Sequence, residues 1–236
     1  MNLTVNDHPE TVKRIPPAAG GKEVFYPCSD GKPMGETGAH VQTIITLFQI
    51  LTNHFRRSDD VAVIANMMFY YVEGDARKVI SPDVFVVRNV GSHVRRVYKL
   101  WEEAAPDVVF EISSRGTRRE DLNRKFQLYQ QIGVKEYYVF DPEYDYLGDE
   151  PLRAFRLIDG VFVKSDVRNG RVFSPALGLE LVDTGKTLRL FDRESGEFLK
   201  TYDEIDTAMD TMETNLKRIE AENDRLRAEL EELKRK

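Results

Sequence analysis

Hydrophobic and polar positions along the chain predict a mixed α/β domain followed by a long helix. Residues 37–55 have a helical pattern that places His40, Ile44 and Leu47 on one face, at spacings of four and three. Apolar runs bounded by turn residues predict strands, and a second helical pattern ends at Gly133. The predicted strands are residues 61–72, 83–87, 107–112 and 136–140, and the second helix is residues 118–132.

The remainder of the first 202 residues completes this domain. Three further segments have the pattern of β-hairpins that extend or flank the sheet. They are residues 152–164, 171–182 and 188–200. Strands with a helix before the last core strand are typical of an α/β layer fold with a mixed sheet. Residues 1–20, which include Pro16 and Pro17, are predicted to form an irregular arm.

Residues 203–236 have a different pattern. Their apolar residues recur at alternating spacings of four and three, which form the heptad seam of a coiled coil. The seam positions are Ile205, Met209, Met212, Leu216, Ile219, Asn223, Leu226, Leu230 and Leu233. Asn223 at an a position favours two parallel strands, and the spacing of Glu222 and Arg227 suits ion pairs between them. We therefore expect a homodimer through residues 203–236, with a different partner chain or a lone amphipathic helix as the alternatives.

Composition argues against a disulfide-rich, a zinc-ribbon or a membrane-spanning protein. The single cysteine, Cys28, excludes a disulfide framework within the chain and a Cys-rich zinc site. No apolar run approaches the ~20 residues that span a bilayer. The first residues lack a signal-peptide pattern, so we expect a cytoplasmic protein without a membrane contact.

Charge is distributed unevenly along the chain. The net charge is −6, of which residues 203–236 contribute −4, from seven Lys/Arg and eleven Asp/Glu. Residues 88–125 hold nine basic and six acidic side chains. This local positive strip is compatible with a nucleic-acid partner, although a solvated surface of mixed sign is the simpler interpretation.

Asp83 and Glu111 are the candidate metal ligands. Asp83 begins a strand, and Glu111 lies within an apolar strand, where an ionised carboxylate is costly unless a cation or hydrogen bonds compensate it. Two carboxylates at neighbouring strand ends can hold Mg²⁺, with waters completing its shell. The simpler interpretations are a turn aspartate and a glutamate paired with arginine. Asp107 lies ~13 Å along the same strand from Glu111, too far to share a metal, so we assign it to the start of the strand.

Two segments of the chain resemble a known family. They are SPDVFVV, at residues 81–87, and RRVYKLWEEAAPDVVFEISSRGTRREDLNRKFQLYQQIGVKEYYVFDPEYDYL, at residues 95–147. They are similar to the Uma family of bacterial restriction endonucleases, in the PD-(D/E)XK nuclease superfamily. The resemblance covers about residues 33–200 and is closest from Pro106 to Pro142. It implies a restriction-endonuclease-like fold, with Asp83 and Glu111 as metal-binding acids. It also implies hydrolysis of phosphodiester bonds, for which DNA is the expected substrate and Mg²⁺ the cofactor, with Mn²⁺ as a substitute.

The chain departs from the superfamily motif at one position. The motif places a lysine two residues after the acid, where this chain has Ser113, and a hydroxyl cannot supply a positive charge. In several branches of the superfamily the lysine lies on the following helix. Lys125 fits that description, since it shares a helical face with Leu122 and Phe126. Its simpler interpretation is a stem packed on the core with the ammonium in solvent.

Ser113 therefore leaves two functions open. The first is a metal-dependent endonuclease in which Asp83, Glu111 and Lys125 are catalytic. The second is a weak or inactive nuclease fold that binds nucleic acid or a protein partner and is oligomerised by its coiled coil. Retention of both carboxylates favours the first function, and Ser113 favours the second.

Other residues are accessory candidates. Glu36 and His40 border the site in related sequences, and Ser113 is a third candidate. The simpler interpretations are a helix-terminal charge for Glu36 and a core histidine for His40. Tyr98 and Trp101 are candidates for stacking on a base, with core burial as the alternative.

Arginines flank the candidate acids. Arg115, Arg118 and Arg119 follow Glu111 closely in the sequence. At the mouth of a nuclease cleft, such residues contact phosphates and position the strand. Ion pairs with neighbouring acidic residues are the alternative.

Overall fold

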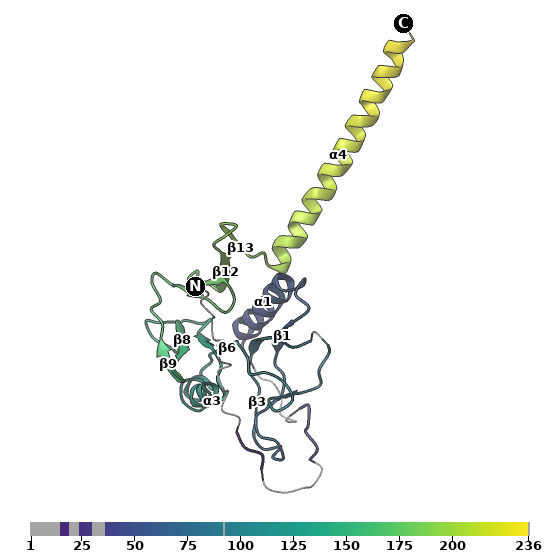
Figure 1. Ribbon diagram of the computed structural model, residues 1–236. Helices are drawn as coiled ribbons and strands as arrows, with labels where there is room; N and C mark the ends of the chain where they lie inside the picture. The colour runs from purple at the N-terminus through teal and green to yellow at the C-terminus, as the bar shows by residue number, and fades with distance from the viewer. Residues whose placement is uncertain (1–14, 19–23, 30–35, 92, 236) are drawn as a thin grey trace, which may run out of the picture. The chain divides into compact units, whose positions relative to one another are not determined.

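The structure is a computed structural model that describes residues 15–18, 24–29, 36–91 and 93–235. The chain divides into two units, residues 1–199 and 200–236. The first unit combines helices with mixed β-sheets, so the predicted α/β fold class is confirmed (Figure 1). Most of the predicted arm lies outside the described residues.

The helices and strands of the first unit follow one another in the order expected for a layered α/β domain. The helical segments are α1 (Gly38–His54), α2 (Arg118–Glu120), the π-helical turn η1 (Asp121–Lys125) and α3 (Phe126–Ile132). The strands are β1 (Val61–Ala65), β2 (Phe69–Tyr70), β3 (Val79–Ile80), β4 (Val84–Arg88), β5 (Tyr98–Lys99), β6 (Val108–Ile112), β7 (Glu136–Phe140), β8 (Leu152–Ile158), β9 (Val161–Lys164), β10 (Arg171–Ser174), β11 (Leu179–Asp183), β12 (Leu188–Asp192) and β13 (Glu197–Phe198).

The strands form three sheets. The main sheet has the order β1-β4-β6-β7-β8-β9, the second has the order β10-β11-β12-β13, and the third has the order β3-β2-β5. In the main sheet β1, β4 and β6 are antiparallel neighbours, whereas β6 and β7 are parallel. A parallel pair requires a crossover connection, and α2, η1 and α3 together supply it.

Each face of the main sheet covers a separate hydrophobic core. On β6, Phe110 and Ile112 belong to the core beneath α1 and the second sheet. Val109 belongs to the core on the other face, which α3 and the third sheet cover. Because side chains alternate along a strand, Glu111 shares the face of Val109 and is directed toward the crossover helices.

The start of α1 and the end of α3 lie where the sequence predicts them. At the start of α1, the Thr37 side chain accepts a hydrogen bond from the His40 backbone N–H at 3.3 Å. This contact caps an otherwise unsatisfied helix terminus. At the end of α3, Gly133 adopts a φ of +84°, which favours glycine and stops the helix. The predicted stop at Gly133 is confirmed.

Two details of the predicted strands are wrong. Residues 61–72 do not form one strand, because Asn66 adopts a φ of +48° after β1 and turns the chain into the third sheet. Asparagine tolerates this left-handed conformation better than most residues. The short strands β3 and β5 were not predicted, because two residues are too few to show an alternating pattern. The three predicted hairpins are present as β8–β9, β10–β11 and β12–β13.

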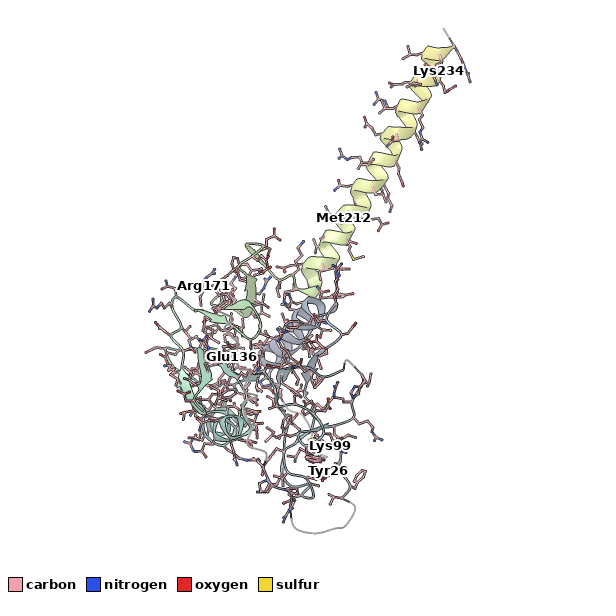
Figure 2. All side chains as sticks on the ribbon, viewed as in Figure 1. Tyr26, Lys99, Glu136, Arg171, Met212 and Lys234 are labelled. Atoms are coloured by element: carbon pink, nitrogen blue, oxygen red, sulfur yellow. The ribbon has the colours of Figure 1, made fainter. Side chains whose placement is uncertain are left out.

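The second unit is the single helix α4 (Tyr202–Lys234). Thr201 and Glu204 form a capping box at its start, in which each side chain accepts a hydrogen bond from the other residue's backbone N–H. Met212 and Lys234, labelled in Figure 2, are both exposed on this helix. No helix in the described part of the chain is long and apolar enough to cross a membrane.

A buried glutamate joins the main sheet to the second sheet. Glu136 begins β7 and is labelled among the packed side chains in Figure 2. Its carboxylate accepts hydrogen bonds from the hydroxyls of Tyr138 and Ser174 and from the Ala176 backbone N–H. The Arg156 guanidinium lies 3.7 Å away. Since β7 lies beside β6, this junction also supports the strand that carries Glu111.

We expect Glu136→Gln to lower the free energy of unfolding by about 1–3 kcal/mol, because a neutral amide leaves buried donors poorly satisfied. Urea denaturation of the full chain measures the loss. Glu150→Gln is the matched control, since Glu150 forms an exposed pair with Lys164 and its loss should leave stability unchanged. Equal unfolding free energies for the two variants would contradict this role of Glu136.

Candidate functional site

The two predicted acids lie at neighbouring strand ends. The register of β4 with β6 pairs Val84 with Phe110, which brings Asp83 and Glu111 to the same edge of the sheet. The Asp83 Oδ2 accepts a hydrogen bond of 2.6 Å from the Ile112 backbone N–H. The sequence prediction that these carboxylates belong to adjacent strands is therefore consistent with the geometry.

Glu111 is buried and held by two side chains from the crossover helices. Its side chain is 1% exposed. The Lys125 ammonium lies 2.7 Å from its Oε2, and the Tyr129 hydroxyl donates to its Oε1 at 2.5 Å. Each carboxylate oxygen can accept a second interaction, so neither contact closes the carboxylate to a further ligand.

The lysine comes from a widened turn of helix. Asp121–Lys125 forms the π-helical turn η1 between α2 and α3, and its first and last side chains are buried. The Lys125 ammonium lies 3.2 Å from the Asp121 Oδ1 as well as beside Glu111. Single π-helical turns occur frequently at functional sites. The snorkelling interpretation of Lys125 is wrong, because its ammonium is buried between two carboxylates.

Burial and unequal charge shift the pKa values of this cluster. Burial raises the pKa of the Glu111 carboxyl well above its usual range, and Lys125 only partly opposes the shift. Burial also raises the pKa of Asp121, again against the influence of Lys125. Burial acts to lower the pKa of Lys125, but the surrounding carboxylates, Glu111 first, outweigh it and raise that pKa. Several carboxylates, including Asp83, therefore share one buried ammonium.

The residues whose chemistry suits a hydrated Mg²⁺ ion are Asp83 and Glu111. They offer carboxylate oxygens, the ligand type that Mg²⁺ prefers, at one edge of the sheet. The carboxyl groups of Asp83, Glu111 and Asp121 lie around one buried ammonium, and a divalent cation would offset the repulsion between their ionised forms. No group of three or more His, Cys, Asp or Glu side chains in the described ranges is arranged around one metal position. Mg²⁺ is commonly held by one or two carboxylates and keeps several of its waters.

The accessory candidates lie around these acids. His40 is buried at the start of α1, with its Nε2 3.9 Å from the Asp83 Oδ1 and its Nδ1 3.6 Å from the Glu36 Oε2. Neither contact is short enough for a strong hydrogen bond, so His40 is not a satisfied core histidine. Ser113 is also buried, and its hydroxyl has no hydrogen-bond partner among the described residues. His40 therefore lies beside Asp83, with Glu36 next to it, whereas Ser113 follows β6 and its hydroxyl makes no hydrogen bond to either acid.

Some of the arginines near the site are free to contact phosphates, whereas others form ion pairs with acidic residues. Arg115 and Arg119 are exposed, and their guanidinium groups form no ion pair within the described part of the chain. Arg118 donates a hydrogen bond of 3.3 Å to the Tyr146 carbonyl. Arg95 and Arg124 instead form ion pairs, with Glu103 and Glu120 respectively.

The two aromatic candidates for base stacking have different environments. Tyr98 is fully buried and donates a hydrogen bond to the Ala104 carbonyl at 2.5 Å, so it cannot stack on a base. Trp101 is half-buried and packs against the Tyr26 ring at a centroid distance of 5.2 Å. Core burial is therefore the correct interpretation of Tyr98.

Asp121 and Tyr129 are site residues that the sequence interpretation missed. One signal was available, because Asp121, Lys125 and Tyr129 recur at intervals of four on a helix whose inward face is otherwise apolar. A buried polar side chain at such a position requires a polar partner.

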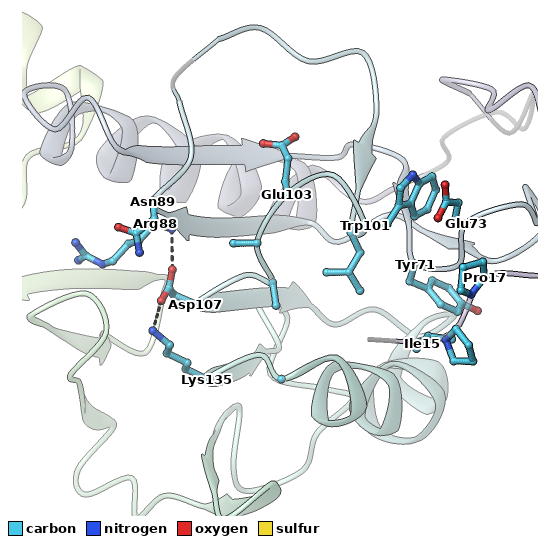
Figure 3. A pocket seen from close by; sticks show the side chains of 15 residues that line it. Ile15, Pro17, Tyr71, Glu73, Arg88, Asn89, Trp101, Glu103, Asp107 and Lys135 are labelled. Atoms are coloured by element: carbon cyan, nitrogen blue, oxygen red, sulfur yellow. Dashed lines mark hydrogen bonds and ion pairs between the residues drawn. The ribbon is translucent and has the colours of Figure 1, made fainter. Parts of the chain in front are cut away.

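A cavity lies near the start of β6, at the other end of this strand from Glu111 (Figure 3). It measures about 580 Å³, and Trp101 and Tyr71 are among its lining residues. Asp107 borders it, accepting a hydrogen bond of 2.7 Å from the Arg88 backbone N–H and pairing with the Lys135 ammonium at 2.7 Å. These contacts occupy the Asp107 carboxylate at the start of β6, as its assignment from the sequence predicts.

Comparison with known proteins relates this arrangement to a family. The family model Uma2, described as "Putative restriction endonuclease", matches residues 13–184. A solved structure described as "a putative nuclease belonging to DUF820", from Anabaena variabilis, is 17% identical with a TM-score of 0.45. That similarity covers 62% of this chain and 76% of the other chain. None of the curated proteins matches. Because the family model spans well over half of the sequence, the chain belongs to the Uma2 family.

Proposed function

We propose that the protein is an endonuclease that uses Mg²⁺ to hydrolyse phosphodiester bonds of DNA, and that Mn²⁺ can replace Mg²⁺. The observation that carries the proposal is the position of the Lys125 ammonium, 2.7 Å from the Glu111 carboxylate. Two acids that can hold a metal ion, with a fixed ammonium beside them, suit metal-assisted hydrolysis of a phosphodiester. The description of the family as restriction endonucleases favours DNA as the substrate. We also propose a cytoplasmic location, because the proposed substrate is DNA.

Asp83 and Glu111 would hold the metal ion. When bound, such an ion lowers the pKa of a coordinated water and neutralises charge on the phosphate. Tyr129 and the Ile112 backbone N–H orient the two carboxylates through their hydrogen bonds. Burial also raises the pKa of the Tyr129 hydroxyl. This group therefore stays protonated and remains a hydrogen-bond donor to Glu111.

Lys125 would stabilise the charge that develops on the phosphoryl oxygens during attack. Its ammonium is fixed before the reaction by Glu111 and Asp121, so little reorganisation is needed. Arg115 and Arg119 are exposed cations close in sequence to this site, and we assign them, with Arg118, to contacts with DNA phosphates.

The position of Lys125 also bears on the alternative function. A weak or inactive binding module was suggested by Ser113 in the usual lysine position. Since a lysine ammonium reaches the acid from the helix instead, the absence of a strand lysine no longer argues against catalysis. We therefore favour the endonuclease over the binding module.

We propose further that α4 pairs with α4 of a second copy in a parallel coiled coil. The apolar seam residues are exposed on the helix, including Leu216, Leu226 and Leu230, each with more than half of its surface accessible. The regular seam, its Asn223 and the charges that flank it fit a two-stranded coiled coil of identical chains. Residues 203–236 would then be the dimerisation element of the protein.

The endonuclease proposal predicts cleavage of supercoiled plasmid in the presence of Mg²⁺ or Mn²⁺, and none in EDTA. Asp83→Asn and Glu111→Gln should each abolish cleavage and weaken Mn²⁺ binding in calorimetry at least ~tenfold, because each removes a charged ligand. Glu120→Gln, an exposed acid on α2, is the matched control and should change neither. Plasmid that stays supercoiled with both metals, or that is cut equally in EDTA, would rule the proposal out.

Lys125→Met should reduce cleavage by about a hundredfold, in the range found when one electrostatic group is removed from an active site. The variant keeps the apolar stem, and Mn²⁺ binding should be retained. Lys135→Met serves as the control, because the exposed Lys135 pairs with Asp107 at the other end of β6. Plasmid cleavage under single-turnover conditions measures both variants. Cleavage at the wild-type rate by Lys125→Met would mean that the catalytic cation lies elsewhere.

The coiled-coil proposal predicts that the full chain is a dimer and that Leu226→Glu converts it to a monomer. A charge at a seam position faces the same charge in the partner helix and removes the apolar contact. Ala228→Glu, two residues away on the outer side of the helix, should leave the dimer intact. Light scattering measures the mass of each variant. A monomeric wild type, or equal masses for the two variants, would refute the homodimer.

A further inference from the structure

Asp121 is a buried carboxylate to which the proposed mechanism gives no role beyond its contact with Lys125. It is 1% exposed, and neither of its oxygens accepts a hydrogen bond of good geometry in the described part of the chain. The Lys125 ammonium lies 3.2 Å from its Oδ1. A carboxylate in this setting is costly to bury. The charge of Lys125 is the main compensation, and the Thr117 side chain also favours the ionised form.

Lys125 therefore lies between two carboxylates and contacts both. Its ammonium is 2.7 Å from Glu111 and 3.2 Å from Asp121. The ion pair with Glu111 alone would be enough to compensate the buried positive charge of Lys125. The second carboxylate becomes necessary when Glu111 has another positively charged partner, because the two cations then compete for the same oxygens.

We propose that Asp121 is a positioning residue that holds the Lys125 ammonium at the site once a metal ion engages Glu111. The inference rests on the proposed function, in which Asp83 and Glu111 bind that ion. Without Asp121, a metal ion at Glu111 would repel a buried ammonium that has no other anchoring carboxylate on its own helix. With Asp121, the ammonium retains an ion pair beside the reacting phosphate.

The π-helical turn η1 makes this arrangement possible. In a regular α-helix, each step of four residues rotates a side chain by ~40° around the axis, so three such residues drift away from a common direction. A π-helical turn winds less tightly and offsets that drift. Asp121, Lys125 and Tyr129 consequently all reach the cluster around Glu111.

Nuclear magnetic resonance of the lysine side-chain nitrogen tests the proposal on the full chain without any cleavage assay. The protons of exposed ammonium groups exchange quickly with water, whereas a buried, ion-paired ammonium gives a resolved ¹⁵N–¹H peak. Lys125→Met identifies the peak by its loss. Glu111→Gln removes the charge of Glu111 as a bound metal ion would neutralise it, so it reproduces the relevant state without metal.

The proposal predicts that the Lys125 peak persists in the wild type, in Asp121→Asn and in Glu111→Gln, but is lost in the double variant. With saturating Mg²⁺, the peak should move to a new chemical shift but persist in the wild type, and it should be lost in Asp121→Asn. A peak that survives in a folded double variant, or one already lost in Glu111→Gln, would overturn the proposal. If the double variant fails to fold, as its amide spectrum would show, Asp121→Asn with Mg²⁺ decides the question.

Cleavage provides a second readout that separates positioning from direct contact. Asp121→Asn should lower kcat by about 10- to 100-fold with little change in KM, as for residues that orient an active-site group. In a Lys125→Met background, the same change should have no further effect, because Asp121 would act only through Lys125. An undiminished effect in that background would mean that Asp121 acts directly and would refute the positioning role.

Failure of the proposed metal site can be distinguished from failure of the positioning role. If no metal binds, Mg²⁺ leaves the wild-type spectrum unchanged, and the variants compared without metal still test Asp121.

Discussion

The burial of Glu111 is the constraint on which the candidate site depends. Its strand, β6, is buried along its whole length, so an ionised carboxylate there is stable only with partners that cross from another element. Lys125 and Tyr129 provide them from the crossover between β6 and β7. The crossover therefore has two roles. It connects two parallel strands, and its widened turn brings Lys125 to the Glu111 carboxylate.

Supplying the ammonium from a helix has a physical consequence. A lysine at the position of Ser113 would belong to the same strand as Glu111, and its place would be set by strand geometry alone. The position of Lys125 depends instead on how α3 packs against the main sheet. Aromatic contacts determine that packing, with Tyr129 and Phe126 at centroid distances of 5.1 and 6.3 Å from Tyr137. A change in how these aromatic side chains pack would therefore also move the Lys125 ammonium relative to Glu111.

The sequence predicted the parts of the site that have a local signal. Asp83 and Glu111 stood out as carboxylates at strand positions, and Lys125 as a charge on an apolar helical face. Asp121 was missed because η1 has no recognised sequence pattern, and its burial depends on the widened turn. The break at Asn66 was missed for a related reason, since residues on both sides of it favour strands and only tertiary pairing separates β1 from β2. Local patterns therefore identified the elements, whereas the contacts between elements determined which polar groups meet.

The proposed pairing of α4 bears on the proposed action on DNA. A helix gains most of its stability from packing an apolar face, and the seam of α4 has its leucines and methionines exposed on the single chain. A parallel pair of such helices is related by a two-fold axis, and each copy would bring one Glu111–Lys125 site. Duplex DNA presents two backbones of opposite direction, so a two-fold pair matches its local symmetry. One site would cut one strand in each encounter, whereas two linked sites would remain close to the second strand after the first is cut.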